Sequence, residues 1–136
     1  MAHAKFRAEV LTPEGEVFND EVELVSTKTA IGSIGILAHH EPVLAMLDPA
    51  ELRLYKTESE VVRFAQAEGY LQVADNRALI LVEEAMEPGE LDAGSLRERL
   101  QQAEHELETA GDDTEKRRVA ERDKRRLEAF LSIAQG

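Results

Sequence analysis

The chain has 136 residues, of which 43% are hydrophobic and 32% are charged, and its formal net charge is −12. Such an acidic chain is repelled by the phosphates of nucleic acids, so we expect no nucleic-acid partner. It contains no cysteine, which excludes disulfides, thiol catalysis and thiolate metal sites.

The N-terminal segment Met1–Phe6 has neither the apolar core of a signal peptide nor the Arg- and Ser-rich pattern of a transit peptide. No apolar run along the chain reaches the ~18 residues that a membrane-spanning helix needs. We therefore expect a cytoplasmic protein with no direct membrane insertion, whose membrane association comes only through a partner.

Residues 1–87 have an apolar period close to two, which is typical of strands with one buried face. The alternation is clear in residues 5–10, 21–24 and 51–55. In residues 21–24, the alternation predicts that Glu21 and Glu23 face water.

Two continuous apolar runs, residues 43–47 and 78–82, predict strands that are buried on both faces. Turn signals separate the segments, for example at Pro13–Gly15, Asp48–Pro49 and Asp75–Asn76. The count is about eight to ten short strands at a spacing of ~8–12 residues, which predicts an all-β sandwich of about ten strands.

The stretch Ile31–Leu44 combines two glycines with a His-x-Pro corner, which predicts a tight turn that reaches the surface. The pair His39–His40 suggests a metal site, but neighbouring side chains of an extended segment point to opposite faces. The glycines lack the spacing of phosphate-binding loops, and no nucleophile has a base placed beside it. We therefore expect no metal site, no catalytic residue and no required cofactor.

After Gly89 the β-branched residues become rare, and Glu, Arg, Leu and Ala dominate. Ser95 and Glu98 have the spacing of a capping box at the start of a helix. Apolar residues then follow at helical spacing as far as Leu107. These features predict a first helix.

A break follows, in which Gly111 suits the left-handed residue that ends a helix. Asp112, with Glu115 three residues later, suits the start of a second helix over about residues 114–132. Two helices joined by a short loop form an antiparallel helical hairpin. Its two apolar stripes are narrow, so the hairpin needs packing contacts with a further surface for stability.

Basic residues outnumber acidic ones by seven to two between Lys116 and Arg126 in the second helix. One interpretation is a solvated surface of i, i+4 ion pairs, and the other is an electrostatic docking face for an acidic partner. Both interpretations remain open at this point. The basic residues are Lys116, Arg117, Arg118, Arg122, Lys124, Arg125 and Arg126.

In this order, the segments resemble the epsilon subunit of the F-type (rotary) ATP synthase along nearly the whole chain. Residues 6–18 resemble the first hairpin of that family. Residues 32–44 resemble its G-x-x-G-I-L-P-G-H-x-P-x-L motif. Residues 69–73 and 75–81 resemble its last two strands.

The resemblance implies a non-catalytic subunit of the proton-translocating ATP synthase, which couples proton flow to ATP synthesis as part of the central rotor stalk. It implies a β-sandwich in residues 1–87 that binds the stalk and a regulatory helical hairpin in residues 88–136. The implied partners are the gamma subunit, the c-subunit ring and the catalytic alpha and beta subunits. The implied location is peripheral, at the cytoplasmic face of the bacterial plasma membrane.

The resemblance also implies two protein-contact sites. The signature loop would contact the c ring or the gamma subunit, and in this chain Ala38 and His39 replace the usual Pro-Gly. The basic residues of the second helix would form an inhibitory docking face that restrains ATP hydrolysis. The candidate loop residues are Ser33, Ile36, Leu37, His39, His40 and Pro42.

Some bacterial relatives bind ATP through an I/L-D-x-x-R-A motif at the start of the first helix. Here Leu91 and Asp92 are present, but Ser95 stands where Arg is expected and Arg97 comes two residues late. Two residues rotate a helical side chain by about 200°. Asp92 and Arg97 are therefore weak candidates, and we do not expect ATP as a regulatory ligand.

Two other hypotheses compete with the rotor subunit. One is a stand-alone protein-binding module, a β-sandwich with a helical hairpin that recruits an unrelated partner. The other is a small β-domain hydrolase, which the absence of a nucleophile–base pair disfavours.

Overall fold

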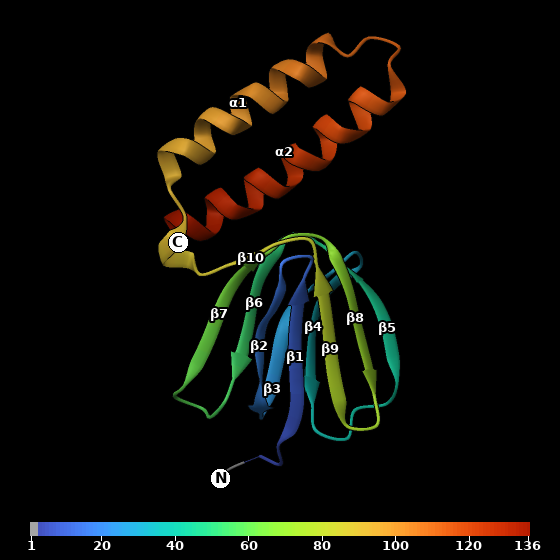
Figure 1. The fold of residues 1–136 in the computed structure, drawn as a ribbon, viewed down its shortest axis with the longest axis vertical. Helices are drawn as coiled ribbons and strands as arrows, with labels where there is room; N and C mark the ends of the chain where they lie inside the picture. The colour runs from blue at the N-terminus through green and yellow to red at the C-terminus, as the bar shows by residue number, and fades with distance from the viewer. Residues whose placement is uncertain (1–2) are drawn as a thin grey trace. The chain divides into compact units, whose positions relative to one another are not determined.

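Ten β-strands form the first of two units in the computed structural model, which describes residues 3–136 (Figure 1). Residue contacts divide the chain into Met1–Glu87 and Pro88–Gly136. The strands are β1 (Phe6–Thr12), β2 (Gly15–Val22), β3 (Leu24–Thr29), β4 (Gly32–Leu37), β5 (Val43–Leu47), β6 (Ala50–Tyr55), β7 (Val61–Gln66), β8 (Gly69–Ala74), β9 (Arg77–Val82) and β10 (Ala85–Met86). The prediction of an all-β unit of about ten strands is confirmed.

The strands pair in the order β10-β7-β6-β3-β5-β8-β9-β1-β2, and β4 pairs with β3. β3 joins the two layers: its first half pairs with β6, and only Thr29 pairs with β5, at Leu47. All pairings are antiparallel except that of β1 with β9. Strands β5, β8, β9, β1 and β2 therefore form one layer of the sandwich, and β10, β7, β6, β3 and β4 form the other.

The core lies between the two layers and consists of the inward-facing side chain of every second strand residue. It is almost entirely aliphatic, with Phe6 and Phe64 as its fully or nearly buried aromatic members. The fully buried members include Val10, Ile36, Leu52, Leu71 and Ile80. The alternation of apolar and polar residues in β1 and β6 therefore does place one face of each strand in the core.

Two predictions about burial are wrong. The runs 43–47 and 78–82 are not buried on both faces, because Leu44, Met46 and Leu81 point to the exterior of the first layer. Glu23 does not face water but is buried. The period of two is interrupted there, because β2 ends at Val22 and the chain bends before β3 begins.

The stretch Ile31–Leu44 is not one continuous turn. Most of its first half is strand β4, which pairs with β3 along its whole length. Gly32, with φ of 134°, is the first residue of β4, directly after the tight β3–β4 connection. A separate turn over residues 38–42 connects β4 to β5. The two glycines and the His-x-Pro corner thus belong to different parts of the fold.

The second unit is an antiparallel helical hairpin, as predicted (Figure 1). A 3₁₀ turn, Pro88–Glu90, precedes helices α1 (Ala93–Thr109) and α2 (Thr114–Gln135). Gly111 has φ of 57° in the loop between the helices, in agreement with the expected left-handed residue. Among residues 3–136, neither helix combines the length and hydropathy needed to cross a bilayer.

The helix caps differ from the prediction. Asp92, rather than Ser95, caps α1, and its Oδ1 accepts hydrogen bonds from the backbone N–H groups of Gly94 (2.9 Å) and Ser95 (3.3 Å). Asp113, rather than Asp112, caps α2 by accepting from the N–H of Lys116 over 3.0 Å. Each cap satisfies backbone donors that have no partner within the helix.

The two helices bury one narrow stripe each against the other. The buried residues of α1 are Leu96 and Ala103, and those of α2 are Ala120, Leu127 and Phe130. Their spacing of three or seven residues places them on one side of each helix. The remaining surface of both helices is mostly exposed and charged.

Candidate functional site

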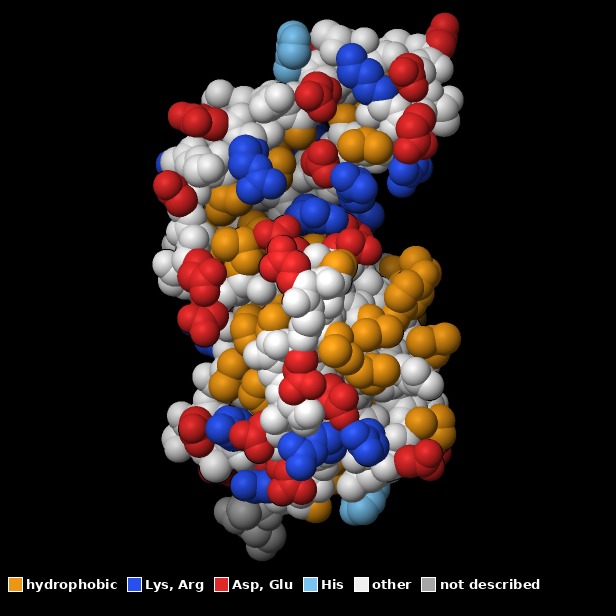
Figure 2. Space-filling model, viewed as in Figure 1, with side chains coloured by type: hydrophobic (Ala, Val, Ile, Leu, Met, Phe, Trp, Pro, Cys, Tyr) orange, Lys and Arg blue, Asp and Glu red, His pale blue; other side chains and the backbone are white. Residues whose placement is uncertain are grey.

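An exposed apolar face covers the outer side of β5, β8 and β9. Met46 pairs across the sheet with Tyr70, which pairs with Leu81. Leu44 lies two residues from Met46 on the same side of β5, and these two side chains are 72% and 63% exposed. Figure 2 shows hydrophobic side chains gathered over these strands. We call Leu44, Met46, Tyr70 and Leu81 the apolar face.

The apolar face is more than a scatter of single residues. Met46, Tyr70 and Leu81 are direct cross-strand neighbours, and the Cβ atoms of such neighbours lie about 4.5–5.5 Å apart in antiparallel sheets. Half-buried Leu79 and Leu11 lie on the same side of β9 and β1. Contiguous exposed apolar surface on a sheet is typical of a protein-contact site.

A shallow groove of about 300 Å³ continues the apolar face at the ends of β8 and β9. Leu11 and Pro13 line one part of it, and Tyr70 and Leu81 line another. Gly69 is required here, because a Cβ at this position would lie 1.9 Å from the carbonyl oxygen of Leu81. The absence of a side chain allows β8 to approach β9 closely beside the groove.

Charged residues border the face at the opposite ends of the strands. Arg77 at the start of β9 forms an ion pair with Glu9 of β1. Arg7 of β1 donates a hydrogen bond to Oδ1 of Asn19 in β2 over 3.2 Å. An apolar centre with a polar border is the usual composition of a protein–protein interface.

The outer side of the second layer is polar by comparison. Glu51 of β6 forms ion pairs with Arg53 on the same strand and with Arg63 of β7. Partial burial raises the pKa of Glu51, but the hydrogen bonds from Arg63 and Arg53 outweigh this effect and lower its pKa below the usual 4.5. At the end of this layer, Lys56 lies 3.0 Å from Asp20.

The β4–β5 turn carries three of the six candidate loop residues close together. His39 and Pro42 are exposed and His40 is half-buried. His39 has φ of 64°, and its backbone N–H donates to Oδ1 of Asn76 over 2.6 Å. Nδ1 of His40 lies 2.6 Å from the carbonyl oxygen of Glu41. The turn is therefore fixed to the β8–β9 turn and presents His39, His40 and Pro42 outward.

The other candidate loop residues are not part of this turn. Ser33 lies near the opposite end of β4, about 13 Å along the strand from Leu37 at ~3.3 Å per residue. Leu37 is 48% exposed on the same side of β4 as Ser33. Ile36 points into the core and is fully buried, so its proposal as a contact residue is wrong.

The basic residues of α2 do not form a single face. At 100° per residue, Arg118, Arg122 and Arg125 lie on the side opposite the buried stripe, whereas Lys116 falls in line with that stripe at its exposed end. Arg118 forms an ion pair with Glu115 (2.6 Å), and Arg122 with Asp123 (3.0 Å). Arg117 donates to the carbonyl oxygen of Gly111 over 2.9 Å.

This arrangement is compatible both with a solvated surface of ion pairs and with an electrostatic docking face. Its ion pairs are local, which is typical of a solvated helix surface. Lys124 is half-buried beside the stripe, and Arg126 lies on its other side. Arg118, Arg122 and Arg125 nevertheless follow one another on the outward side of α2 over two turns, and we call these three exposed residues the basic strip.

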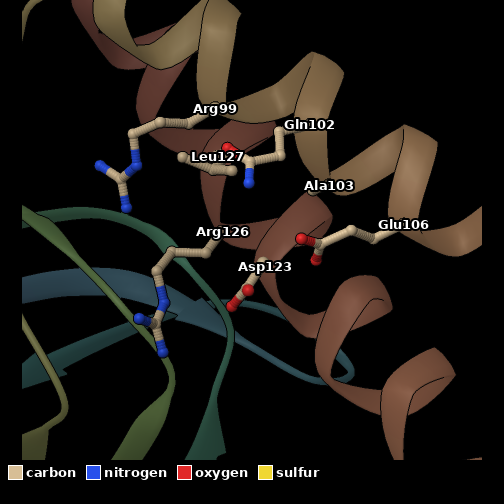
Figure 3. A pocket seen from close by; sticks show the side chains of 7 residues that line it. All are labelled: Arg99, Gln102, Ala103, Glu106, Asp123, Arg126 and Leu127. Carbon is tan, nitrogen blue, oxygen red and sulfur yellow. The ribbon is translucent and has the colours of Figure 1, made fainter.

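A polar groove of about 200 Å³ lies between α1 and α2 (Figure 3). Arg99 and Arg126 lie together on one side of it, and Glu106 and Asp123 on the other. Sequence reasoning did not select Arg99 or Glu106, although Arg99, Gln102 and Glu106 share one side of α1 through their spacing. The candidates Asp92 and Arg97 do not line this groove: Asp92 caps the helix and Arg97 is exposed.

Within residues 3–136, no three His, Cys, Asp or Glu side chains are arranged to hold an ion. His39 and His40 belong to the β4–β5 turn, where Nδ1 of His40 lies beside the carbonyl oxygen of Glu41.

The comparisons with known proteins agree with this architecture. The family described as "ATP synthase, Delta/Epsilon chain, beta-sandwich domain" matches residues 5–88. The ATP synthase epsilon chain of Sulfurihydrogenibium sp. is 33% identical over 95% of this chain and 96% of its own. The ATP synthase epsilon chain of Rubrobacter xylanophilus is 37% identical over 87% of this chain and 82% of its own.

A solved structure shows the same fold. A chain of the Euglena gracilis mitochondrial ATP synthase, determined as OSCP/F1/c-ring in rotational state 1, superimposes with a TM-score of 0.82 at 21% identity. The match covers 95% of this chain and 81% of that one. From its sequence and its fold, the present chain belongs to the family of ATP synthase epsilon chains, which are non-catalytic subunits of that complex.

Proposed function

We propose that this chain is a coupling subunit of the central rotor stalk, located at the cytoplasmic face of the bacterial plasma membrane. In this role it joins rotation of the c ring to ATP synthesis by the catalytic alpha and beta subunits, and its helical hairpin restrains ATP hydrolysis. The single observation that carries the proposal is the apolar face of Leu44, Met46, Tyr70 and Leu81.

The apolar face binds the gamma subunit in this proposal. Burying one leucine or methionine side chain contributes about 1.5–3 kcal/mol, so four neighbouring side chains supply enough energy for a lasting contact. A coupling subunit needs such a contact because it must turn with the shaft without slipping. The charged border formed by Arg77, Glu9 and Arg7 then fixes the orientation of the two proteins.

The β4–β5 turn contacts the c ring. His39, His40 and Pro42 reach outward from a backbone that Asn76 holds in place. A fixed turn loses little conformational entropy when it binds, which favours transmission of torque through a small contact. Ser33 and Leu37 lie on β4, outside this turn, and contribute a separate contact with the c ring.

The hairpin acts on the catalytic subunits through the basic strip of α2. Arg118, Arg122 and Arg125 attract an acidic surface over a long range, and the local ion pairs with Glu115 and Asp123 exchange for contacts with the partner. ATP bound to this chain is not required for the mechanism. The engagement of Asp92 as a helix cap supports that view.

Reconstitution with the gamma subunit, the catalytic subunits and the c ring tests the proposal. The full chain should co-purify with the gamma subunit and should couple hydrolysis to proton pumping. Removal of residues 88–136 should leave co-purification intact and raise the rate of hydrolysis. A full chain that stays monomeric in the presence of the gamma subunit would refute the proposed function.

A further inference from the structure

We propose that a pocket on the outer side of β3, β4 and β6 binds the side chain of an arginine that belongs to a partner protein. The pocket has a volume of about 200 Å³. Its lining residues are His3, Glu23, Leu24, Leu37, Tyr55 and Glu58. It lies on the layer opposite the apolar face, so it is separate from the surface assigned above to the gamma subunit.

The walls of the pocket are apolar and follow directly from the strand register. Leu24 of β3 is the cross-strand neighbour of Leu37 in β4 and of Tyr55 in β6. The three side chains therefore form one row across the layer. Leu37 remains 48% exposed, so the row is open to a ligand. Such a row suits the aliphatic stem of a long side chain.

A buried carboxylate indicates the charge of the ligand. Glu23 lines the pocket and is only 4% exposed. Its backbone N–H donates to the carbonyl oxygen of Tyr55 over 2.7 Å. Within residues 3–136, however, its side chain has no hydrogen bond or ion pair. The carboxylate oxygens of Glu23 are not among the buried unpartnered atoms of the described residues, so they reach the pocket, where a cation can form charge-assisted hydrogen bonds with them.

The nearby cations of the chain are already engaged. Lys56 pairs with Asp20 at 3.0 Å and with Glu60 at 3.9 Å, and Arg53 pairs with Glu51 at 3.3 Å. Among the residues that line the pocket, His3 carries the one basic side chain. The rim adds a second carboxylate, that of Glu58. The pocket therefore has an excess of negative charge and attracts a cation from outside the chain.

An arginine fits these features better than a lysine does. Its guanidinium group is planar, is more weakly hydrated than an ammonium group and stacks on aromatic rings, such as that of Tyr55. Its planar fork also matches the two oxygens of Glu23. A volume of about 200 Å³ is far larger than a single water molecule needs, so the pocket admits a side chain.

The test is an NMR titration of the ¹⁵N-labelled full chain with acetyl-arginine-N-methylamide. The analogue of the same shape with neutral citrulline is the matched control ligand. We expect saturable shifts at the amides of Leu24, Leu37 and Tyr55, with an affinity for arginine at least tenfold higher than for citrulline. The lysine analogue should bind more weakly than arginine.

Protein variants then assign the effect to one carboxylate. The isosteric Glu23→Gln substitution should abolish the preference for arginine over citrulline, whereas Glu16→Gln on edge strand β2 should leave it unchanged. Equal response to arginine and citrulline, tighter binding of lysine, or wild-type affinity in Glu23→Gln would overturn the proposal. If Glu23→Gln fails to fold, the comparison of arginine with citrulline on the natural chain decides the question. None of these measurements involves the gamma subunit, so their outcome is independent of the proposed function.

Discussion

The backbone N–H of His39 donates a hydrogen bond to the side chain of Asn76, a residue that lies 37 positions away in the chain. This bond connects the turn after β4 to the turn after β8. Both residues have positive φ, 64° for His39 and 59° for Asn76, so each turn has a specific and uncommon backbone shape. The bond therefore holds in place the loop that is proposed to contact the c ring.

Substitution of Asn76 by glycine tests this connection. Glycine keeps the positive φ but removes the acceptor, so the free energy of unfolding should fall by about 1 kcal/mol. Urea denaturation measures the change, and hydrogen exchange at the amide of His39 should become faster. The matched control is Asp75→Gly, because Asp75 also has positive φ, 52°, and accepts no bond from His39. Equal destabilisation by the two substitutions would contradict a special role for Asn76.

The apolar face is tested by a double substitution, Leu44→Glu and Met46→Glu. Both side chains are exposed, so the melting temperature should change little. Two buried charges at an interface should weaken binding to the gamma subunit by at least about tenfold, measured by co-purification or by calorimetry. Ile31→Glu is the control, because Ile31 is 99% exposed at the β3–β4 connection, outside the apolar face. Loss of binding with the control, or retention with the double variant, would refute this assignment.

The network around Glu51 predicts a pH dependence of stability. The pKa of Glu51 is lowered in the folded state, so its stabilising effect is fully present above the ordinary pKa of 4.5 and is lost as the pH falls through the lower folded value. Glu51→Gln should therefore flatten the loss of stability in this acidic range. Denaturation midpoints at several pH values measure the effect. Glu98→Gln, on the exposed surface of α1, should leave the wild-type profile unchanged.

The basic strip of α2 predicts an effect on ATP hydrolysis. Arg118→Glu combined with Arg122→Glu should raise the hydrolysis rate of the reconstituted complex roughly fivefold, which corresponds to a loss of about 1 kcal/mol of docking energy. The control, Arg97→Glu with Arg99→Glu on α1, changes the net charge by the same amount. A similar increase with both pairs would show that net charge, rather than the strip, controls the rate.

Thermal denaturation with and without ATP tests the ligand prediction. A ligand at one hundred times its Kd stabilises a protein by about 2.7 kcal/mol, which moves the melting temperature by several degrees. We expect no such shift at millimolar ATP, because Asp92 caps α1 and Arg97 does not line the groove between the helices. A clear increase would contradict this expectation. Arg99→Gln and Arg126→Gln would then show whether the groove is the binding site.

The sequence allowed prediction of the number of strands, their polarity pattern and the helical hairpin, because these depend on local periodicity. It did not allow prediction of which apolar runs are buried on both faces and which leave one face exposed. Residues 43–47 are continuous and apolar, yet Leu44 and Met46 are exposed. An exposed apolar patch has the same hydrophobic composition as a core strand, so the sequence pattern does not distinguish the two.

Two positions show how tertiary structure selects between local signals. Asp92 and Ser95 are both good N-cap residues, but a cap at Asp92 places Leu91 and Leu96 at the N′ and N4 positions, where apolar residues stabilise the start of a helix. The burial of Glu23 could not be predicted from alternation, since it depends on a bend between two strands and on the register of Leu24 with Tyr55.

The parallel pairing of β1 with β9 has a consequence for biosynthesis. Arg7 lies opposite Arg77 and Leu11 opposite Leu81, so the first strand cannot find its inner neighbour until more than eighty residues have left the ribosome. Until that time β1 can pair only with β2, and its other edge stays open to foreign strands. The nascent chain is therefore most vulnerable to misassembly late in translation, just before the hairpin emerges.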